Sequence, residues 1–287
     1  MNWNDWLLTH DVVIRLVFFV GIFTLMAVWE LRAPRRSLSV SKTGRWLNNL
    51  GLIAFNSLLL RLLFPAAAVG LAAVAQEKSW GMLNAVELPL LPATVFSVIA
   101  MDFVIYLQHV MVHAVPALWR LHRVHHADLD YDVTTGARFH PIEIVLSMLI
   151  KFATILVLGP PVVGVLIFEV LLNATAMFNH GNVRLPDRLD LVLRAFVVTP
   201  DMHRVHHSVA DDEANSNFGF SLPWWDRLFG TYRDQPRGGH RGMTLGIHHY
   251  RDAKQVARLP GMLMLPFHGK ITGYAINRRE WQPADEA

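Results

Sequence analysis

The chain contains no cysteine among its 287 residues. This absence excludes disulfides within the chain, thiolate zinc sites and thiolate-ligated iron–sulfur clusters. Any metal site must therefore be built from histidine, with or without carboxylates.

Charged residues are also scarce. They make up 17% of the chain, whereas hydrophobic residues make up 53% and the mean hydropathy is +0.30. A typical soluble domain carries about 25% charged residues. The net charge is +3, but basic residues flank apolar runs and no basic–aromatic stripe is present. The composition therefore predicts a membrane protein that contacts anionic lipid and no nucleic acid.

The N-terminus lacks the marks of a cleaved signal peptide. Residues 1–11 have no positive region, and no A-x-A site follows the apolar run at 12–31. We expect this run to be a retained membrane helix.

Five apolar runs approach the roughly 20 residues that a helix needs to cross the hydrocarbon core. Gly159-Pro160-Pro161 predicts a helical hairpin between the last two, because neither proline fits inside a helix. Arg61 indicates a break in the second run, and Lys151 leaves open whether the hairpin crosses the membrane or only dips into it. The runs are approximately 12–31, 50–75, 90–113, 142–158 and 161–178.

The loop after the first run carries five basic residues, and the positive-inside rule places it in the cytoplasm. The third and fifth runs then both end on that side. We expect an all-α fold: a multi-pass membrane helical bundle of about four to five helices with a cytoplasmic helical cap. Predicted units are N-terminal membrane helices at 1–94, a histidine-containing domain at 95–235 and its C-terminal cytoplasmic extension at 236–287.

Ten of the fifteen histidines lie between positions 109 and 207. Residues at i, i+3 and i+4 share a helix face, so each cluster is expected to aim its imidazoles at one point. Imidazole suits Fe, Zn, Cu and Ni, which predicts a metal centre for more than one ion. The ten are His109, His113, His122, His125, His126, His140, His180, His203, His206 and His207.

Each part of this pattern also has an explanation that does not involve a metal. The stripe of Asp102 and Tyr106 before His109 is either a set of residues that orient metal ligands or a polar seam of the bundle. H-x-x-H-H at 122–126 could be an exposed basic helix, but Lys or Arg would serve that purpose better. His140 and His180 are weaker candidates alone, and Asn182 is a candidate ligand or orienting residue. We interpret the other five histidines, His10, His240, His248, His249 and His268, as structural or surface residues.

These motifs resemble the fatty acid hydroxylase/sterol desaturase superfamily of membrane-bound oxygenases, specifically its bacterial members. The resemblance rests on H-x-x-x-H at 109–113, H-x-x-H-H at 122–126 and 203–207, and the runs 132–143 and 217–232. Some relatives have a second histidine where this chain has Arg184, so the resemblance leaves one coordination position either empty or filled by His140.

The resemblance implies O2-dependent hydroxylation or desaturation of a lipid-like substrate at two iron ions, with Zn²⁺ a substitute in isolated protein. It implies catalytic residues limited to the metal ligands, and electrons from an external ferredoxin, cytochrome or flavin reductase. It also implies that residues 95–235 are the catalytic domain. The location would be the bacterial inner membrane, with the site on the cytoplasmic side.

Two other classes of protein could also use such histidine clusters. A metal transporter or metal-binding membrane protein would spread its histidines along a path through the bilayer. A zinc hydrolase would need a glutamate beside its ligands, as in H-E-x-x-H, and the sequence contains no such motif.

Overall fold

The computed structural model describes residues 3–86 and 88–269, which form helices and loops without a named strand. Five helical stretches in this part of the chain are long and apolar enough to cross a membrane. The expected all-α, multi-pass class is therefore confirmed. The long helices are α1 (Trp3–Arg32), α2 (Lys42–Leu63) with α3 (Ala67–Glu77), α4 (Leu90–Ala114), α6 (Pro141–Leu158) and α7 (Val162–Asn179).

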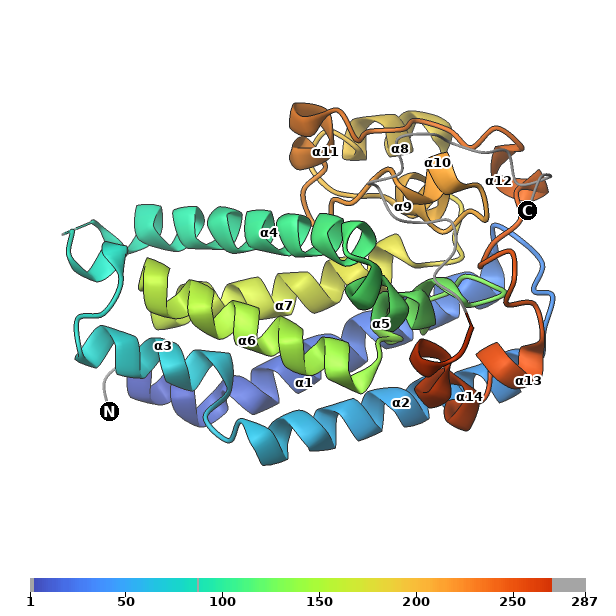
Figure 1. The fold of residues 1–287 in the computed structure, drawn as a ribbon. Helices are drawn as coiled ribbons and strands as arrows, with labels where there is room; N and C mark the ends of the chain where they lie inside the picture. Colours follow the sequence, from blue (N-terminus) through green and yellow to red (C-terminus); the bar gives the residue numbers. More distant parts are fainter. Residues whose placement is uncertain (1–2, 87, 270–287) are drawn as a thin grey trace.

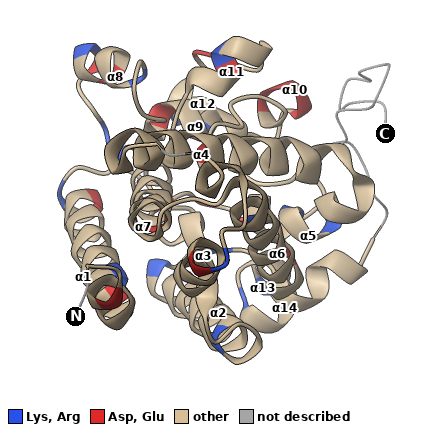
Figure 2. Cartoon of the chain, turned by 90° about the vertical axis from the view of Figure 1, so that its left-hand side faces the viewer, with Lys and Arg blue, Asp and Glu red and all other residues tan. Residues whose placement is uncertain are grey.

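The long helices pack side by side, with α7 against α1, α3 and α4 (Figure 1). Their shared core contains Met101, Ile105, Val165 and Phe168, all buried. In Figure 2, seen from the left-hand end, most of each long helix is free of charge colouring, whereas α8, α10 and α11 carry several charges. The bundle thus has the low charge that the composition predicts.

The hairpin between α6 and α7 forms where the sequence predicts it. Gly159 ends α6 with a left-handed φ of +66°, and α7 begins after Pro161. A Cβ at position 159 would lie 2.6 Å from the Trp80 carbonyl oxygen. Glycine is required there by both its conformation and this close approach.

The second apolar run is broken as Arg61 indicates. Helix α2 ends at Leu63, and α3 begins at Ala67, after Pro65. Proline removes a backbone donor and cannot continue the helix. Arg61 lies exposed in the last turn of α2.

Lys151 has charged partners inside the bundle and does not interrupt α6. Its Nζ lies 3.0 Å from Glu169 Oε1 on α7, while the other Glu169 oxygen lies 2.8 Å from Arg15 on α1. Arg15 also pairs with Asp11 at 2.9 Å. Such pairing is what an ionisable group in an apolar helix requires.

All but one of the remaining elements gather at one end of the bundle, the end at which α4 and α7 finish (Figure 1). Trp119 and Val124 of α5 pack there against Met262 and Leu265 in a second core. The predicted extension 236–287 includes residues 270–287, which lie outside the described residues. The elements at this end are α5 (Pro116–His126), α8 (Asp187–Leu193), α9 (Pro200–His206), α10 (Asp211–Ala214), α11 (Trp224–Phe229), α12 (Gly239–Gly242), α13 (Ala253–Val256), α14 (Leu259–Met264) and the 3₁₀ turns η2 (Thr135–Ala137) and η3 (Leu265–Phe267). The 3₁₀ turn η1 (Met82–Asn84) lies at the opposite end, beside the turn between α6 and α7.

Candidate metal centre

Nine histidines form two compact, fully buried groups at the end of the bundle. Within each group, one ring nitrogen per residue lies within 4.8 Å of all the others. We call them the first and the second histidine group. The first contains His109, His113, His122, His126 and His206, and the second contains His125, His180, His203 and His207.

Each H-x-x-H-H motif contributes to both groups. On α5, His122 and His126 join the first group and His125 the second. On the turn at α9 the assignment is reversed: His203 and His207 join the second group and His206 the first. The expectation that each cluster aims at one point is therefore wrong for the two H-x-x-H-H motifs, whereas His109 and His113 join the same group as expected. Each motif faces two points, because i+3 and i+4 differ by about 100° around a helix.

Local sequence explains where these helices begin. Pro116 starts α5, and Pro200 starts α9. Proline suits the first turn, where its missing N–H has no intrahelical partner. The Thr199 side chain caps α9 by accepting a hydrogen bond from the Met202 N–H at 3.4 Å.

Backbone carbonyls orient several of the imidazoles. A carbonyl oxygen can only accept, so each ring Nδ1 facing one must donate. His109 donates to Phe218 at 2.8 Å, His206 to Ser216 at 2.7 Å and His180 to Ala176 at 2.8 Å. In these three rings the Nε2 lone pair remains available, the arrangement usual for metal-bound histidine.

The spacing of ring nitrogens fits metal coordination. The Nε2 atoms of His113 and His126 lie 3.1 Å apart, and those of His125 and His180 lie 3.2 Å apart. Two imidazoles bound to one ion at about 2.1 Å would have nitrogens about 3.0–3.4 Å apart. Buried ring nitrogens without a hydrogen-bond partner in the described residues include Nε2 of His109, His122, His206 and His207, Nδ1 of His113 and His125, and both nitrogens of His203. The residues therefore fit metal ions.

Six of the clustered histidines outside the long helices have a lowered pKa and are neutral near pH 7. Burial lowers the pKa of His180 and of His206 to about 3. Burial, and then neighbouring imidazoles, lower the pKa of His125, His126, His203 and His207 well below 6.5. The neutral imidazole is the metal-binding form.

His140 lies outside both groups. Its Nδ1 caps α6 by accepting the Ile142 N–H at 3.2 Å, and its Nε2 lies 3.3 Å from the Leu263 carbonyl oxygen. His180, the other weaker candidate, lies in the second group. Arg184 is exposed, with its side chain 3.9 Å from Asp187.

Three other predicted site residues make hydrogen bonds to segments distant in the sequence. They are Asp102, Tyr106 and Asn182. Asp102 accepts hydrogen bonds from the backbone at 221–222 and from Trp225, which ties α4 to α11 and to the segment before it. Tyr106 lies 3.1 Å from the Thr231 hydroxyl. Asn182 makes two hydrogen bonds with the Arg36 backbone.

Glu143 is an orienting residue that the sequence reasoning missed. Its Oε1 lies 2.6 Å from Nδ1 of His122, and both residues are buried. Its place three residues after His140, in the first turn of α6, is the signal that could have found it.

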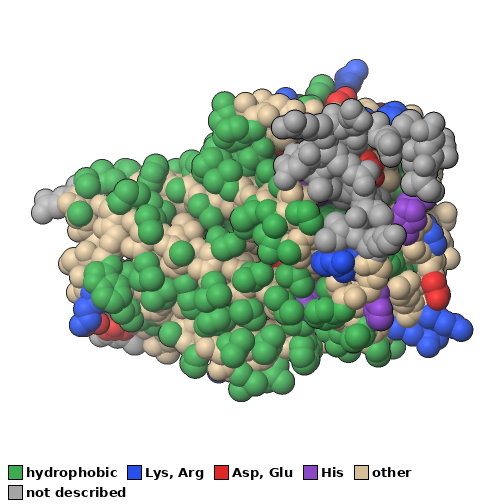
Figure 3. Space-filling view, in the orientation of Figure 1, with side chains coloured by type: hydrophobic (Ala, Val, Ile, Leu, Met, Phe, Trp, Pro, Cys, Tyr) green, Lys and Arg blue, Asp and Glu red, His purple; other side chains and the backbone are tan. Residues whose placement is uncertain are grey.

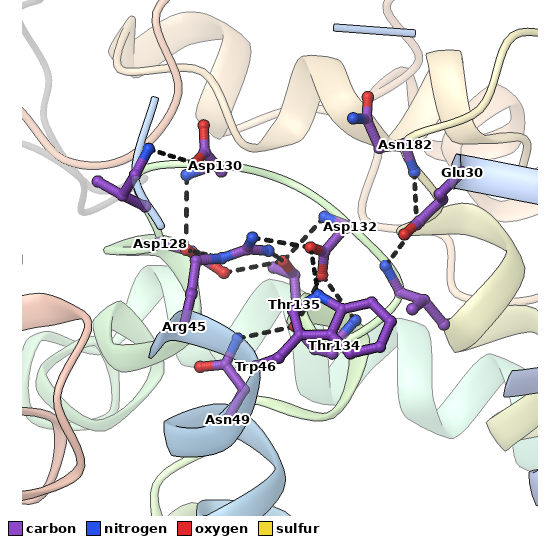
Figure 4. Close-up of polar contacts among 12 residues, drawn as sticks. Glu30, Arg45, Trp46, Asn49, Asp128, Asp130, Asp132, Thr134, Thr135 and Asn182 are labelled. Atoms are coloured by element: carbon purple, nitrogen blue, oxygen red, sulfur yellow. Dashed lines mark hydrogen bonds and ion pairs between the residues drawn. The ribbon is translucent and has the colours of Figure 1, made fainter. Parts of the chain in front are cut away.

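A buried polar network anchors the loop between α5 and α6 (Figure 4). Arg45 on α2 lies 2.8 Å from Asp128 and 2.7 Å from Asp132. Trp46 donates to Asp132 at 2.8 Å. Glu30 on α1 accepts from the Val133 N–H at 2.7 Å and from the N–H of residue 182 at 2.9 Å. The loop is thereby joined to α1 and α2 directly beside the histidines.

The fold and the site define a multi-pass helical membrane protein with a buried, all-histidine candidate metal centre. Residues 94–231 match the family model described as "Fatty acid hydroxylase". This match, over slightly less than half of the chain, agrees with the resemblance seen in the motifs.

The similar curated proteins are lipid oxygenases by name. Ornithine lipid hydroxylase OlsE of Rhizobium tropici is 31% identical over 52% of this chain and 44% of its own length. Human alkylglycerol monooxygenase is 28% identical over 54% of this chain and 34% of its own. Fatty acid hydroxylase vlmA of Lecanicillium sp is 30% identical over 56% of this chain and 46% of its own length. The chain thus matches less than half the length of each relative. No solved structure gives a significant match.

Proposed function

We propose that this protein is an integral-membrane di-iron oxygenase that hydroxylates a lipid with O2. The observation that carries the proposal is the pair of adjacent histidine groups, nine buried imidazoles at one end of an apolar helix bundle. The names of the relatives support hydroxylation over desaturation.

The ligand set favours a redox metal. Imidazole suits iron, and the absence of thiolates argues against copper(I) and iron–sulfur chemistry. When bound, iron would activate O2, the oxidant that an unactivated C–H bond requires. The first histidine group would hold one ion and the second group the other.

The chain's own residues would position the ligands and exclude water. His122 is oriented by Glu143, and His109, His180 and His206 by backbone carbonyls. All nine histidines are buried. Ligands carried mainly on helices and fixed by such contacts support a precise site.

The basic loop between α1 and α2 supports a cytoplasmic site, because α4 and α7 end on the same side of the bundle as that loop. Electrons would then come from a separate soluble or membrane-bound reductase. The transport alternative requires ligands along a path across the bilayer, whereas the two groups are adjacent.

The experiment compares wild type with His125→Ala and His140→Ala. We expect iron to bind to the wild type and to the His140 variant, and O2-dependent lipid oxidation to need His125. His140→Ala is the matched control because it removes a buried histidine outside both groups. Well-folded wild type that binds no iron and oxidises no lipid in the presence of a reductant would refute the proposal.

A further inference from the structure

A cavity of about 380 Å³ lies between α4, α5 and α6. Its volume is in the range of pockets that bind small molecules, about 300–1,000 Å³. The walls are mostly aliphatic, including Met111, Leu118, Leu121 and Ile150. Such walls favour a hydrocarbon ligand.

The cavity is elongated along α6. Lining residues Glu143, Ser147, Ile150 and Ala153 recur every three or four positions and so share one face of the helix. The ten-residue step from 143 to 153 corresponds to about 15 Å along the helix. A slot of this form suits an extended aliphatic chain.

The rim of the cavity lies on the outer surface of the bundle. Met111, Leu146 and Leu149 line it and are 38%, 36% and 47% exposed. Figure 3 shows that hydrophobic side chains dominate this face over α2, α4 and α6. In a membrane this face contacts lipid, so a lipid can enter the cavity sideways from the bilayer.

Two buried oxygen atoms near the histidines lack a donor. Glu143 Oε1 contacts His122, but its Oε2 is buried and has no hydrogen-bond partner in the described residues. The side-chain oxygen of Gln108 is also buried and unpartnered. Both residues line the cavity. Buried polar atoms are normally satisfied, so these two indicate a ligand that donates hydrogen bonds.

We propose that the cavity binds the aliphatic chain of a lipid whose hydrogen-bond donor, a hydroxyl or an amide N–H, meets Gln108 and Glu143. The donor end lies beside His122, and the chain extends toward Ala153. This inference rests on the proposed function, since it names the class of substrate that the histidine site would oxidise.

The binding test uses 1-hexadecanol carrying a mid-chain diazirine, added to the metal-loaded protein without reductant. Cross-links mapped by mass spectrometry should concentrate on the lining of α4, α5 and α6. Unlabelled 1-hexadecanol should compete about five- to tenfold better than hexadecane, the effect of roughly one hydrogen bond. Gln108→Leu should remove most of this preference while leaving competition by hexadecane unchanged.

Two filling variants test the position of the chain. Ser147→Phe and Ala153→Phe should each reduce cavity labelling at least fivefold. Val157→Phe is the control, because residue 157 lies on the same helix, is 65% exposed and does not line the cavity. Labelling spread evenly over α1 and α2, or labelling that both filling variants leave unchanged, would overturn the proposal. Equal metal content in all variants establishes that the fold is retained.

Turnover of the same probe separates this inference from the proposed function. A probe that labels the cavity but is never oxidised with O2 and reductant contradicts the oxygenase proposal and leaves the site supported. Oxidation that continues unchanged in Ser147→Phe and Ala153→Phe contradicts the site alone.

Discussion

Replacing Arg45 with methionine should destabilise the protein strongly. Arg45 is 1% exposed and lies within 2.8 Å of both Asp128 and Asp132, which are also buried. Each Coulomb attraction is on the order of 5 kcal/mol at an effective dielectric constant of about 20. Most of this offsets the cost of burying the charges, but removing one partner leaves two buried carboxylates. Arg138 remains 3.6 Å from Asp128 and partly compensates its charge, so Asp132 loses more of its charge pairing than Asp128 does.

The expected loss is about 3–5 kcal/mol, or a fall in Tm of roughly 6–20 °C. Thermal unfolding in detergent measures it. Arg61→Met is the matched control, since residue 61 is exposed on the same helix and should change Tm by less than about 2 °C. Adding Asp132→Asn to the Arg45 variant should recover part of the loss, because it removes the uncompensated charge. An Arg45 variant as stable as the control would refute the reasoning.

The ion pair of Arg45 and Asp132 also predicts that the thermal stability of the protein depends on pH. Burial alone would raise the pKa of Asp132, but Arg45 and hydrogen bonds from Thr134 and Trp46 hold it below 3.8. A carboxyl whose folded pKa is lowered contributes stability above its unfolded pKa and loses it as the pH falls. The difference in Tm between the wild type and the Arg45 variant should therefore shrink below about pH 4.

Two further substitutions test contacts that hold the site and the bundle. Glu30→Ala leaves the N–H groups of residues 133 and 182 without their acceptor and should lower the free energy of unfolding by about 2–6 kcal/mol. Glu30→Gln keeps an oxygen acceptor there and should lower it less. Thermal unfolding measures both effects. Gly159→Ala should cost at least about 1–2 kcal/mol because of its positive φ, whereas Gly21→Ala, in a helix with no atom within 4 Å of the added Cβ, should be neutral or stabilising by about 0.5–1 kcal/mol. Equal effects of the two glycine variants would contradict the assigned role of Gly159.

Hydropathy and turn chemistry were sufficient to predict the long helices and the hairpin. Each run is long and apolar enough for a membrane helix, and Gly159-Pro160-Pro161 predicts the turn between the last two. The convergence of His180 on the clusters also follows from topology, since α7 returns to the end at which α4 finishes. These inferences depend on local sequence and on chain direction alone.

The orienting contacts could not be predicted in this way. Arg45 and Asp132 are 87 residues apart in sequence, and no local pattern encodes their pairing. His140 resembles a ligand in sequence, but the start of α6 at Pro141 directs its Nδ1 to the backbone as a helix cap. Asp102 lies on the same face of α4 as His109, yet its hydrogen-bond partners are in the segment 221–225. Partners in distant segments decide each of these roles.

The geometry of H-x-x-H-H explains why the two histidine groups are adjacent. Positions i and i+4 are about 40° apart around a helix, whereas i+3 lies about 100° from i+4. Such a motif presents a pair of imidazoles in one direction and a single one in another. Because α5 gives its pair to the first group and the α9 turn gives its pair to the second, each motif contributes to both groups. The stacked rings of His126 and His207, 4.6 Å apart, lie where the groups meet. Two facing motifs of this kind can therefore enclose two ions at once, which a single motif with one aiming direction could not do.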